Sequence, residues 1–424
     1  MRKKHFLFAS VLALLCSSST LHAQDFKLTS SGYFKNQGVD VMAFDDIYPE
    51  GPQGGVCIIM NGHRVATNGD IRLEATPGQW QPVPKQLDRK LGDNSITATL
   101  CYPDSSRHLT GFNPMIYPDL HLIYTVNVES KGKNIEVTVD LDRPIPQEFI
   151  GKVGFNLEFF PGSLFGKPWI MDGQSGIFPQ QPNSPLMTTQ PNYLHTGNYH
   201  DGKKSLADMD KLIGKGYSPI VADDIISEPY AKGTKFTSRP DDPYNKVTIE
   251  SLSGDLQLFD GRMNHNNGWF VLRSNIKPGV TKGAVKWIIT PNVVADWMYQ
   301  PVIQTSQIGY HPTQDKEAVI EMDIRDNRKE TAQIIRIDAD GEKVVKNVTP
   351  ANWGKFLRYN YLKVNFTDVK EPGLYKIKYN TSVSPIFRID NDVYARGVWQ
   401  PVLEYFLPVQ MCHMRVNEKY RVWH

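Results

Sequence analysis

Two segments of the 424-residue sequence combine aromatic side chains with amide side chains, a pairing that suits carbohydrate binding. They are residues 160–196 and residues 264–269. A sugar ring can lay its C–H face on a flat aromatic ring while neighbouring amides bond its hydroxyl groups. The candidates for contact with carbohydrate are Trp169, Tyr193, Asn264, Asn266 and Trp269.

A structural role for the same segments stands beside this hypothesis. Residues 160–196 are rich in proline and glycine, so the sequence predicts a loop, and a loop of that length in a compact domain tends to be functional. Aromatic side chains are mostly buried, however, and these could close the open end of a β-sandwich. The Asn267-Gly268 pair can form a turn without any ligand.

Other patterns of reactive residues are weaker. Acidic doublets occur at three places, and two well-separated carboxylates can hydrolyse a glycosidic bond as acid and base. Neighbours in a strand point to opposite faces, so such doublets usually serve turns, caps or calcium. The doublets are Asp45-Asp46, Asp223-Asp224 and Asp241-Asp242.

The sequence shows no motif that assigns a cofactor. The eleven histidines show no zinc spacing, and the sequence contains no nucleophile elbow and no phosphate-binding glycine loop. We therefore predict no cofactor and no catalytic residue, and leave a metal site open. The net charge is +2, from 47 basic and 45 acidic residues, which gives no electrostatic reason to expect a nucleic-acid partner.

The N-terminus has the features of a signal peptide. Arg2, Lys3 and Lys4 precede an apolar run that is too short to span a bilayer, and a small-residue cleavage site ends at Ala23. We expect residues 1–23 to be removed and the protein to be secreted, periplasmic or displayed at the cell surface. Cys16 leaves a lipoprotein open, although Leu15 is too large for that processing site.

Three cysteines follow the predicted signal peptide: Cys57, Cys101 and Cys412. An odd number argues against a framework of disulfides. Cys57 and Cys101 both lie in apolar, strand-like contexts. They could form a bridge in an oxidising compartment, but buried free thiols fit these surroundings better.

Hydrophobic alternation predicts that residues 24–300 form a large antiparallel β-sandwich. Ile135, Val137, Val139 and Leu141 alternate with polar residues, and similar patterns precede them at 96–102 and 120–128. Further strands are expected at 247–249, 256–259, 269–272 and 285–289, a hairpin turn at 131–134 and a short helix at 205–213. Turns are expected at Asn61-Gly62, Asn68-Gly69, Asp260-Gly261 and Asn267-Gly268.

Residues 301–390 predict a smaller sandwich of the immunoglobulin type. Apolar residues alternate at 318–322, 362–366 and 375–379, and Asp340-Gly341 has the signature of a two-residue hairpin. In 391–424, apolar residues at 398–407 recur at helical spacing behind the possible capping residues 390–392. Pro401 and Pro408 require this helix to be kinked or to begin later. The fold class is therefore mainly β, with one C-terminal helix.

These last 120 or so residues resemble a known family. The motif Gln307-x-Gly309-Tyr310-x-Pro312 and the blocks 365–367, 372–375 and 384–389 resemble the immunoglobulin-like domain of glycoside hydrolase family 9 cellulases. The helix that follows resembles the first helix of the catalytic (α/α)6 barrel in that family. Met411-Cys412-His413 stands where many relatives have Arg-Cys-Gly.

The resemblance implies the N-terminal accessory portion of a secreted cellulase-type enzyme that acts on β-glucan. The catalytic Asp pair and Glu of the family lie in the barrel beyond that first helix, so no catalytic residue is carried over. We expect this chain to be catalytically silent, and the helix to pack against the rest of the barrel.

Two other functions remain open from the sequence. The chain could be a self-contained secreted protein that binds carbohydrate or acts as a scaffold, using the segments 160–196 or 264–269. It could also be an independent hydrolase with two converging carboxylates in a cleft within residues 25–300.

Overall fold

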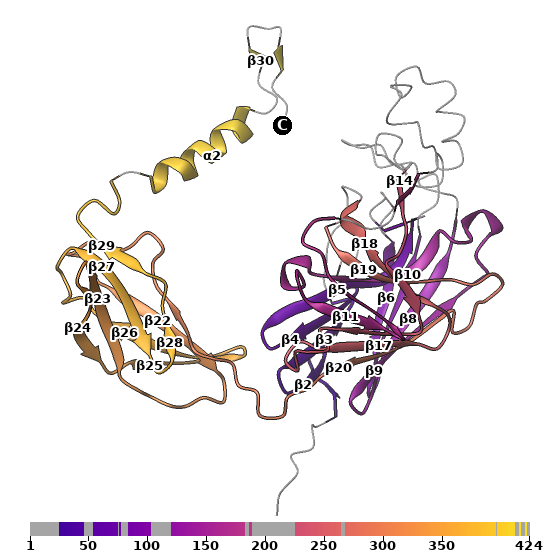
Figure 1. Ribbon diagram of the computed structural model, residues 1–424, viewed down its shortest axis with the longest axis horizontal. Coiled ribbons are helices and arrows are strands. Elements are labelled where there is room, and N and C mark those ends of the chain that lie inside the picture. Colours follow the sequence, from indigo (N-terminus) through magenta and orange to yellow (C-terminus); the bar gives the residue numbers. More distant parts are fainter. Residues whose placement is uncertain are drawn as a thin grey trace, which may run out of the picture. The chain divides into compact units, whose positions relative to one another are not determined.

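The computed structural model describes most of the chain (Figure 1). The described residues are 25–45, 54–74, 76–77, 84–102, 120–182, 186–188, 225–263, 268–395, 397–411, 415–416 and 420–421. The chain divides into two compact units, which we call the N-terminal unit (Met1–Trp297) and the C-terminal unit (Met298–His424). The predicted signal peptide and the predicted helix at 205–213 lie outside the described residues.

Within the described residues, the N-terminal unit contains two antiparallel sheets of nine strands each. The first has the order β1 (Lys27–Leu28), β2 (Phe34–Asn36), β3 (Val39–Ala43), β4 (Val56–Met60), β5 (His63–Leu73), β10 (Val153–Phe159), β19 (Phe270–Asn275), β18 (Leu256–Asp260) and β15 (Ala231–Gly233). The second has the order β12 (Gln174–Ile177), β11 (Pro168–Met171), β16 (Lys235–Ser238), β17 (Val247–Ser251), β20 (Val285–Pro291), β9 (Asn134–Leu141), β8 (Ile123–Lys131), β7 (Ser95–Cys101) and β6 (Lys85–Leu91).

Short elements complete this unit. They are the 3-10 helices η1 (Gln147–Phe149), η2 (Pro161–Ser163) and η3 (Gly261–Met263), and the paired strands β13 (Leu186–Thr188) and β14 (Ile225–Ser227).

One hydrophobic core lies between the two nine-stranded sheets. Strand β9 illustrates how the sequence forms this core: its apolar residues are buried at every second position, as their alternation predicted. Across the core, the ring of Phe155 on β10 meets Trp287 on β20 edge to face, with 5.0 Å between centroids. The indole Nε1 of Trp287 donates a hydrogen bond to Ser274 Oγ at 3.0 Å. A large aromatic residue is thus buried with its polar group satisfied.

Most of the predicted strands and two of the predicted turns are confirmed. Strands β17, β18, β19 and β20 lie where expected, and β8 and β9 form the hairpin that Lys131 and Asn134 close. Asn61-Gly62 is the two-residue turn between β4 and β5, with φ of 52° and 84°. Positive φ at both positions is what a type I′ turn requires.

Two predictions in this unit are wrong. Asn68-Gly69 is not a turn but an irregularity inside the long strand β5, where the pairing with β4 and β10 shifts register. Residues 160–182 are not a plain loop, because β11 and β12 form a hairpin that pairs with β16 at the edge of the second sheet. A bulge and an edge hairpin both tolerate the glycines that suggested turn and loop.

The C-terminal unit is a smaller sandwich with its own core. Its described strands form a four-stranded sheet, β21 (Val302–Gln304), β22 (Glu317–Asp323), β26 (Tyr359–Asn365) and β25 (Ala351–Phe356). They also form a five-stranded sheet, β24 (Gly341–Val348), β23 (Ala332–Asp338), β27 (Gly373–Tyr379), β28 (Ser382–Val383) and β29 (Phe387–Ile389). Apolar residues of both sheets, including Ile320, Leu362 and Ile377, are fully buried, which confirms the predicted alternation. The hairpin near residue 340 is present, but Asp338 pairs with Gly341, so its turn is Ala339-Asp340.

The predicted C-terminal helix is α2 (Trp399–Met411), the one α-helix among the described residues. It begins after Asp392, which is one of the two outcomes expected from the prolines. Pro401 falls in its first turn, where proline is tolerated, and Pro408 lies inside the helix. The capping prediction for residues 390–392 is wrong. Asp392 instead forms an ion pair with Arg388 at 2.9 Å, and its carbonyl accepts a hydrogen bond from Ala395 N. The short pair β30 (Arg415–Val416) and β31 (Tyr420–Arg421) follows.

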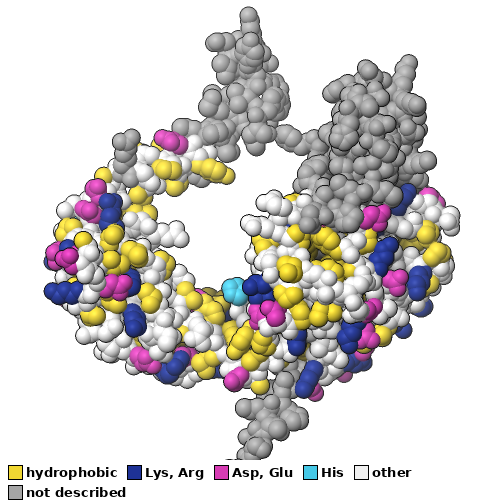
Figure 2. Space-filling model, in the orientation of Figure 1, with side chains coloured by type: hydrophobic (Ala, Val, Ile, Leu, Met, Phe, Trp, Pro, Cys, Tyr) yellow, Lys and Arg dark blue, Asp and Glu magenta, His cyan; other side chains and the backbone are white. Residues whose placement is uncertain are grey.

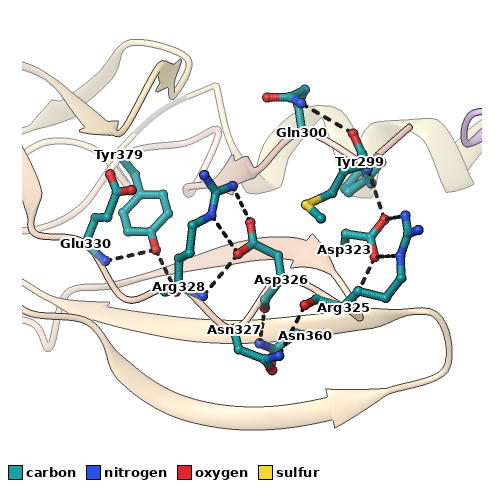
Figure 3. A network of polar contacts seen from close by, with 11 residues as sticks. Tyr299, Gln300, Asp323, Arg325, Asp326, Asn327, Arg328, Glu330, Asn360 and Tyr379 are labelled. Atoms are coloured by element: carbon teal, nitrogen blue, oxygen red, sulfur yellow. Dashed lines mark hydrogen bonds and ion pairs between the residues drawn. The ribbon is translucent and has the colours of Figure 1, made fainter. Parts of the chain in front are cut away.

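A network of charged residues fixes the first residues of the C-terminal unit (Figure 3). The carboxylate of Asp323 accepts hydrogen bonds from Arg325 N and Nε at 2.9 and 2.8 Å, from its Nη2 at 2.7 Å, and from Tyr299 N at 3.0 Å. Asp326 holds Arg328 in the same way, with bonds of 3.0, 2.9 and 2.6 Å. Each Asp-x-Arg pair therefore closes a local clamp, and the first also anchors the segment before β21.

Removing the large ring from the core should destabilise the N-terminal unit. We expect Trp287→Ala to lower the free energy of unfolding by about 3–5 kcal/mol, because a buried tryptophan leaves a cavity. Urea unfolding at neutral pH measures the change. Trp353→Ala is the control: Trp353 is 55% exposed, so its loss should cost within about 0.5 kcal/mol. Equal effects of the two substitutions would contradict this packing.

The Asp323 clamp predicts acid sensitivity of the C-terminal unit. Burial opposes ionisation of Asp323, but hydrogen bonds from Arg325 and Tyr299 outweigh it and lower its pKa to about 2. A lowered pKa stabilises the fold above the unfolded value near 4, and this stability is lost as the pH falls toward 2. We expect Asp323→Asn to cost about 2 kcal/mol at neutral pH. Calorimetry should show that the deficit shrinks in acid; a deficit independent of pH would argue against the clamp.

Candidate functional site

A hollow of about 400 Å³ opens on the N-terminal unit, beside the first sheet. Its lining comes from β3, β4 and β5 and from the segments that follow β10 and precede β19. The side chains that bear on its chemistry are those of Asp45, Arg64, Thr67, Asn68, Phe160 and Trp269. The hollow thus joins aromatic, amide, hydroxyl and charged groups.

The two segments that the sequence singled out meet at this hollow. The ring of Phe160, just after β10, lies perpendicular to that of Trp269, just before β19, with centroids 4.5 Å apart. Strands β10 and β19 are neighbours in the sheet and pair Phe159 with Phe270. The antiparallel pairing therefore brings residues more than 100 positions apart in the sequence into contact.

Arg262 lies in the segment before Trp269 and is held there by several hydrogen bonds. Asp260, fully buried at the end of β18, accepts hydrogen bonds from Arg262 Nε and Nη2, both at 2.8 Å. The guanidinium also donates to the carbonyls of Pro179 and Gln180 at 2.9 and 2.8 Å. It lies over the ring of Phe270 at 4.5 Å. One residue thereby connects the segments 160–182 and 261–269.

Asn68 reaches the hollow because β5 is irregular at this point. Its φ of 56° lies in the left-handed region, which asparagine tolerates better than most residues. The side-chain amide donates to Glu158 Oε2 at 2.5 Å, and Glu158 is itself buried on β10. A buried carboxylate thus holds the orientation of the amide.

Cys57 and Thr67 lie side by side in the lining. Cys57 Sγ is 3.0 Å from Thr67 Oγ1 and 3.1 Å from the carbonyl of Gly54. Cys57 is buried, Cys101 is partly buried, and neither forms a disulfide. The preference for free thiols over a Cys57–Cys101 bridge is therefore confirmed.

A buried charged cluster lies further along β5, β10 and β19. Asn156 Nδ2 donates to Glu74 Oε1 at 2.6 Å, and Arg273 donates from Nη2 to the Glu74 carbonyl at 2.9 Å and from Nη1 to Asn156 Oδ1 at 3.1 Å. All three residues are at most 1% exposed. Burial raises the pKa of Glu74 to about 7, against the opposing effect of Arg273 and Arg72.

The carbohydrate-contact candidates have different positions. Trp269 lines the hollow and is half-buried. Trp169 is 7% exposed and packs in the core with its ring against Gly176, which favours the structural role for that residue. Tyr193, Asn264 and Asn266 lie outside the described residues.

The residues of the acidic doublets also have different positions and contacts. Asp45 lines the hollow and forms an ion pair with Arg89 at 3.6 Å. Asp242 accepts hydrogen bonds from Tyr244 N and Asn245 Nδ2 at 2.9 and 3.0 Å, which is the turn chemistry expected of such a doublet. Asp46 and the doublet 223–224 lie outside the described residues.

Sequence reasoning missed Asn68, Glu158 and Arg262. The sequence predicts a turn at Asn68-Gly69, but the same pair is also compatible with a bulge inside a strand. Arg262 follows Asp260 at the Asp-x-Arg spacing that recurs at 323–325 and 326–328. The packing of Glu158 beside Asn68 depends on strands 90 positions apart, and no local pattern announces it.

Metal and membrane sites are not indicated in the part of the chain that the structure describes. There, no three His, Cys, Asp or Glu residues gather to hold a metal ion. No helix in the same residues is long and apolar enough to cross a membrane.

The exposed apolar side chains of helix α2 are a second feature of interest. Trp399, Val402 and Leu403, at the spacing of one helical side, are 56%, 60% and 54% exposed, and Tyr405 is 71% exposed. Hydrophobic side chains gather along one side of this helix in Figure 2. Soluble domains ordinarily bury such a stripe.

Taken together, the described chain is a mainly β protein of two sandwiches, with a hollow on the first and an exposed helix after the second. Residues 298–384 match the family described as the cellulase N-terminal ig-like domain. A comparison with curated protein sequences finds no match.

Solved structures give weaker likenesses. A metagenome-derived glycoside hydrolase family 9 endoglucanase is 26% identical over 28% of this chain and 23% of its own, with a TM-score of 0.22. A family 9 protein from Bacteroides ovatus is 22% identical over 28% and 20%, with a TM-score of 0.21. The Slr1438 protein from Synechocystis sp. PCC 6803 is 11% identical over 69% and 100%, with a TM-score of 0.30. The chain spans less than a quarter of the length of these two family 9 proteins.

The Glu74 cluster predicts a pH dependence of stability. A pKa raised from 4.5 to about 7 means that stability is fully present below pH 4.5 and is lost as the pH rises through 7. The loss should be on the order of 3 kcal/mol. Glu74→Gln cannot ionise, so its stability should lack this decline.

Urea unfolding of the wild type and the variant, repeated at intervals between about pH 4 and pH 8, tests this expectation. Hydrogen exchange of peptides from β5 and β10 assigns the effect to the N-terminal unit. Parallel pH profiles for the two proteins would show that Glu74 does not titrate in this range.

Proposed function

We propose that this chain is the N-terminal accessory portion of a secreted cellulase-type glycoside hydrolase. In this proposal the C-terminal unit braces a catalytic (α/α)6 domain, α2 is the first helix of that domain, and the whole enzyme cleaves β-glucan. The observation that carries the proposal is the exposed apolar side of α2, which directly follows the immunoglobulin-like domain.

The physical argument is the cost of leaving α2 in water. A helix of 13 residues is marginally stable by itself, so it needs tertiary contacts. Burying a large apolar side chain is worth roughly 1.5–3 kcal/mol, and Trp399, Val402 and Leu403 are all more than half exposed. A partner surface built of further helices would both cover these side chains and stabilise the helix.

The assignment of that partner rests on two agreeing observations. Residues 298–384 match the cellulase N-terminal ig-like domain, and the sequence that follows resembles the first barrel helix of family 9 cellulases. Hydrolysis in that family inverts the anomeric centre, which requires two carboxyl groups roughly 6.5–9.5 Å apart. We assign neither carboxyl group to this chain, and the proposed secretion rests on residues 1–23.

Catalytic silence is the first test. We expect purified residues 24–424 to release no reducing sugar from carboxymethylcellulose or xyloglucan, because the proposed catalytic groups belong to the barrel. A family 9 endoglucanase serves as the positive control. Hydrolysis that scales with the concentration of this protein would refute the accessory assignment.

The exposed stripe of α2 gives a second test. We expect the isolated protein to bind the dye ANS and to self-associate at high concentration, since an apolar patch lies open. Leu403→Asn should reduce both signals. Leu374→Asn is the matched control, because Leu374 is 47% exposed but belongs to β27 and not to α2. If the control lowers the signals as much as Leu403→Asn, the stripe is not their source.

A further inference from the structure

We propose that the hollow on the N-terminal unit binds one neutral sugar residue of a glycan. This inference goes beyond the accessory function, because the hollow contains no part of residues 298–384 and does not involve α2. It assigns the first sandwich a ligand of its own. The argument rests on the shape of the hollow, its aromatic wall, its polar groups and the way these are held.

The size of the hollow suits one sugar ring. Its volume of about 400 Å³ lies at the lower end of the range of roughly 300–1,000 Å³ for small-molecule sites. Asp45 and Arg64 are exposed to solvent, so the lining includes groups at its mouth. A ring that belongs to a longer glycan could therefore enter from solution.

Trp269 supplies the aromatic surface. It lines the hollow and is half-buried, and the perpendicular ring of Phe160 supports it at 4.5 Å. The backbone carbonyl of Trp269 also accepts a hydrogen bond from Gly261 N at 2.9 Å. The indole is thus presented at a fixed place, which lowers the entropic cost of stacking a sugar ring on it.

Besides the Thr67 hydroxyl, an amide and two charged side chains complete the polar lining. Asn68 offers an amide, Arg64 a guanidinium and Asp45 a carboxylate. Sugar hydroxyls both donate and accept hydrogen bonds, so a mixed set of donors and acceptors matches them. One positive and one negative side chain line the hollow, which favours an uncharged sugar over a uronic acid or a phosphorylated sugar.

Two of these groups, those of Asn68 and Asp45, are positioned before any ligand arrives. Glu158 holds the Asn68 amide, and the left-handed backbone at Asn68 directs it. Asp45 pairs with Arg89, whose Nε and Nη2 are anchored on the carbonyls of Ala43 and Gly32 at 2.9 and 2.7 Å. Preorganised groups of this kind are what a small polar ligand requires for measurable affinity.

The test is calorimetric titration of purified residues 24–424 with glucose, galactose, xylose, cellobiose and xylobiose. We expect saturable binding of at least one of these neutral sugars. Trp269→Ala and Asn68→Gly should each weaken it by about tenfold or more, because each removes one wall of the site. Glycine keeps the positive φ at position 68, so this variant should fold even if the tryptophan variant does not.

Controls separate this site from the rest of the molecule. Trp353→Ala, an exposed tryptophan of the C-terminal unit, should leave sugar affinity unchanged. Leu403→Asn should also leave it unchanged, so failure of the accessory function and failure of the sugar site are distinguishable. Circular dichroism confirms that each variant is folded.

Three results would overturn the proposal. One is the absence of binding by every neutral sugar in the set. Another is unchanged affinity in folded Trp269→Ala or Asn68→Gly protein. The third is tighter binding of glucuronic acid than of glucose, which would show that the hollow selects charge.

Discussion

Every sheet in this protein has to hide one face from water, and that constraint organises both units. In the N-terminal unit the two large sheets hide their apolar faces against each other, with Trp287 and Phe155 meeting across the core. The C-terminal sandwich does the same around Ile320 and Ile377. Helix α2 differs from these buried faces, because Trp399 and Leu403 remain more than half exposed. This contrast is the basis for the proposal that a partner covers α2.

The first sheet of the N-terminal unit contains a cluster of buried polar and charged side chains. Glu74, Asn156 and Arg273 are almost completely buried, and they satisfy one another by hydrogen bonds. Buried charges of this kind are costly unless paired, so the cluster imposes a specific arrangement on β10 and β19. Strand β10 ends just before Phe160 and β19 begins just after Trp269, the two aromatic residues at the wall of the hollow. Rigid strands behind a site favour the accuracy that ligand binding needs.

Sequence patterns predicted what depends on neighbours along the chain. Alternation at 135–141 located β9, and Asn61-Gly62 located a hairpin, because both signals are complete within a few residues. The sequence did not predict the bulge at Asn68, since an Asn-Gly pair looks alike in a turn and in a bulge. It selected Trp269 and Trp169 equally, and only the pairing of distant strands separates a wall of the hollow from a core residue. Local sequence patterns do not contain the register in which distant strands pair.

Hydrogen exchange of α2 tests the central claim most directly. In the isolated protein the amides of residues 399–411 should exchange rapidly, because a short helix without partners opens readily. After addition of a family 9 catalytic domain that lacks both its immunoglobulin-like domain and its first helix, they should become protected in the wild type but not in Leu403→Asn. Strong protection of α2 in the isolated protein would contradict the account, as would its continued rapid exchange in the presence of that domain.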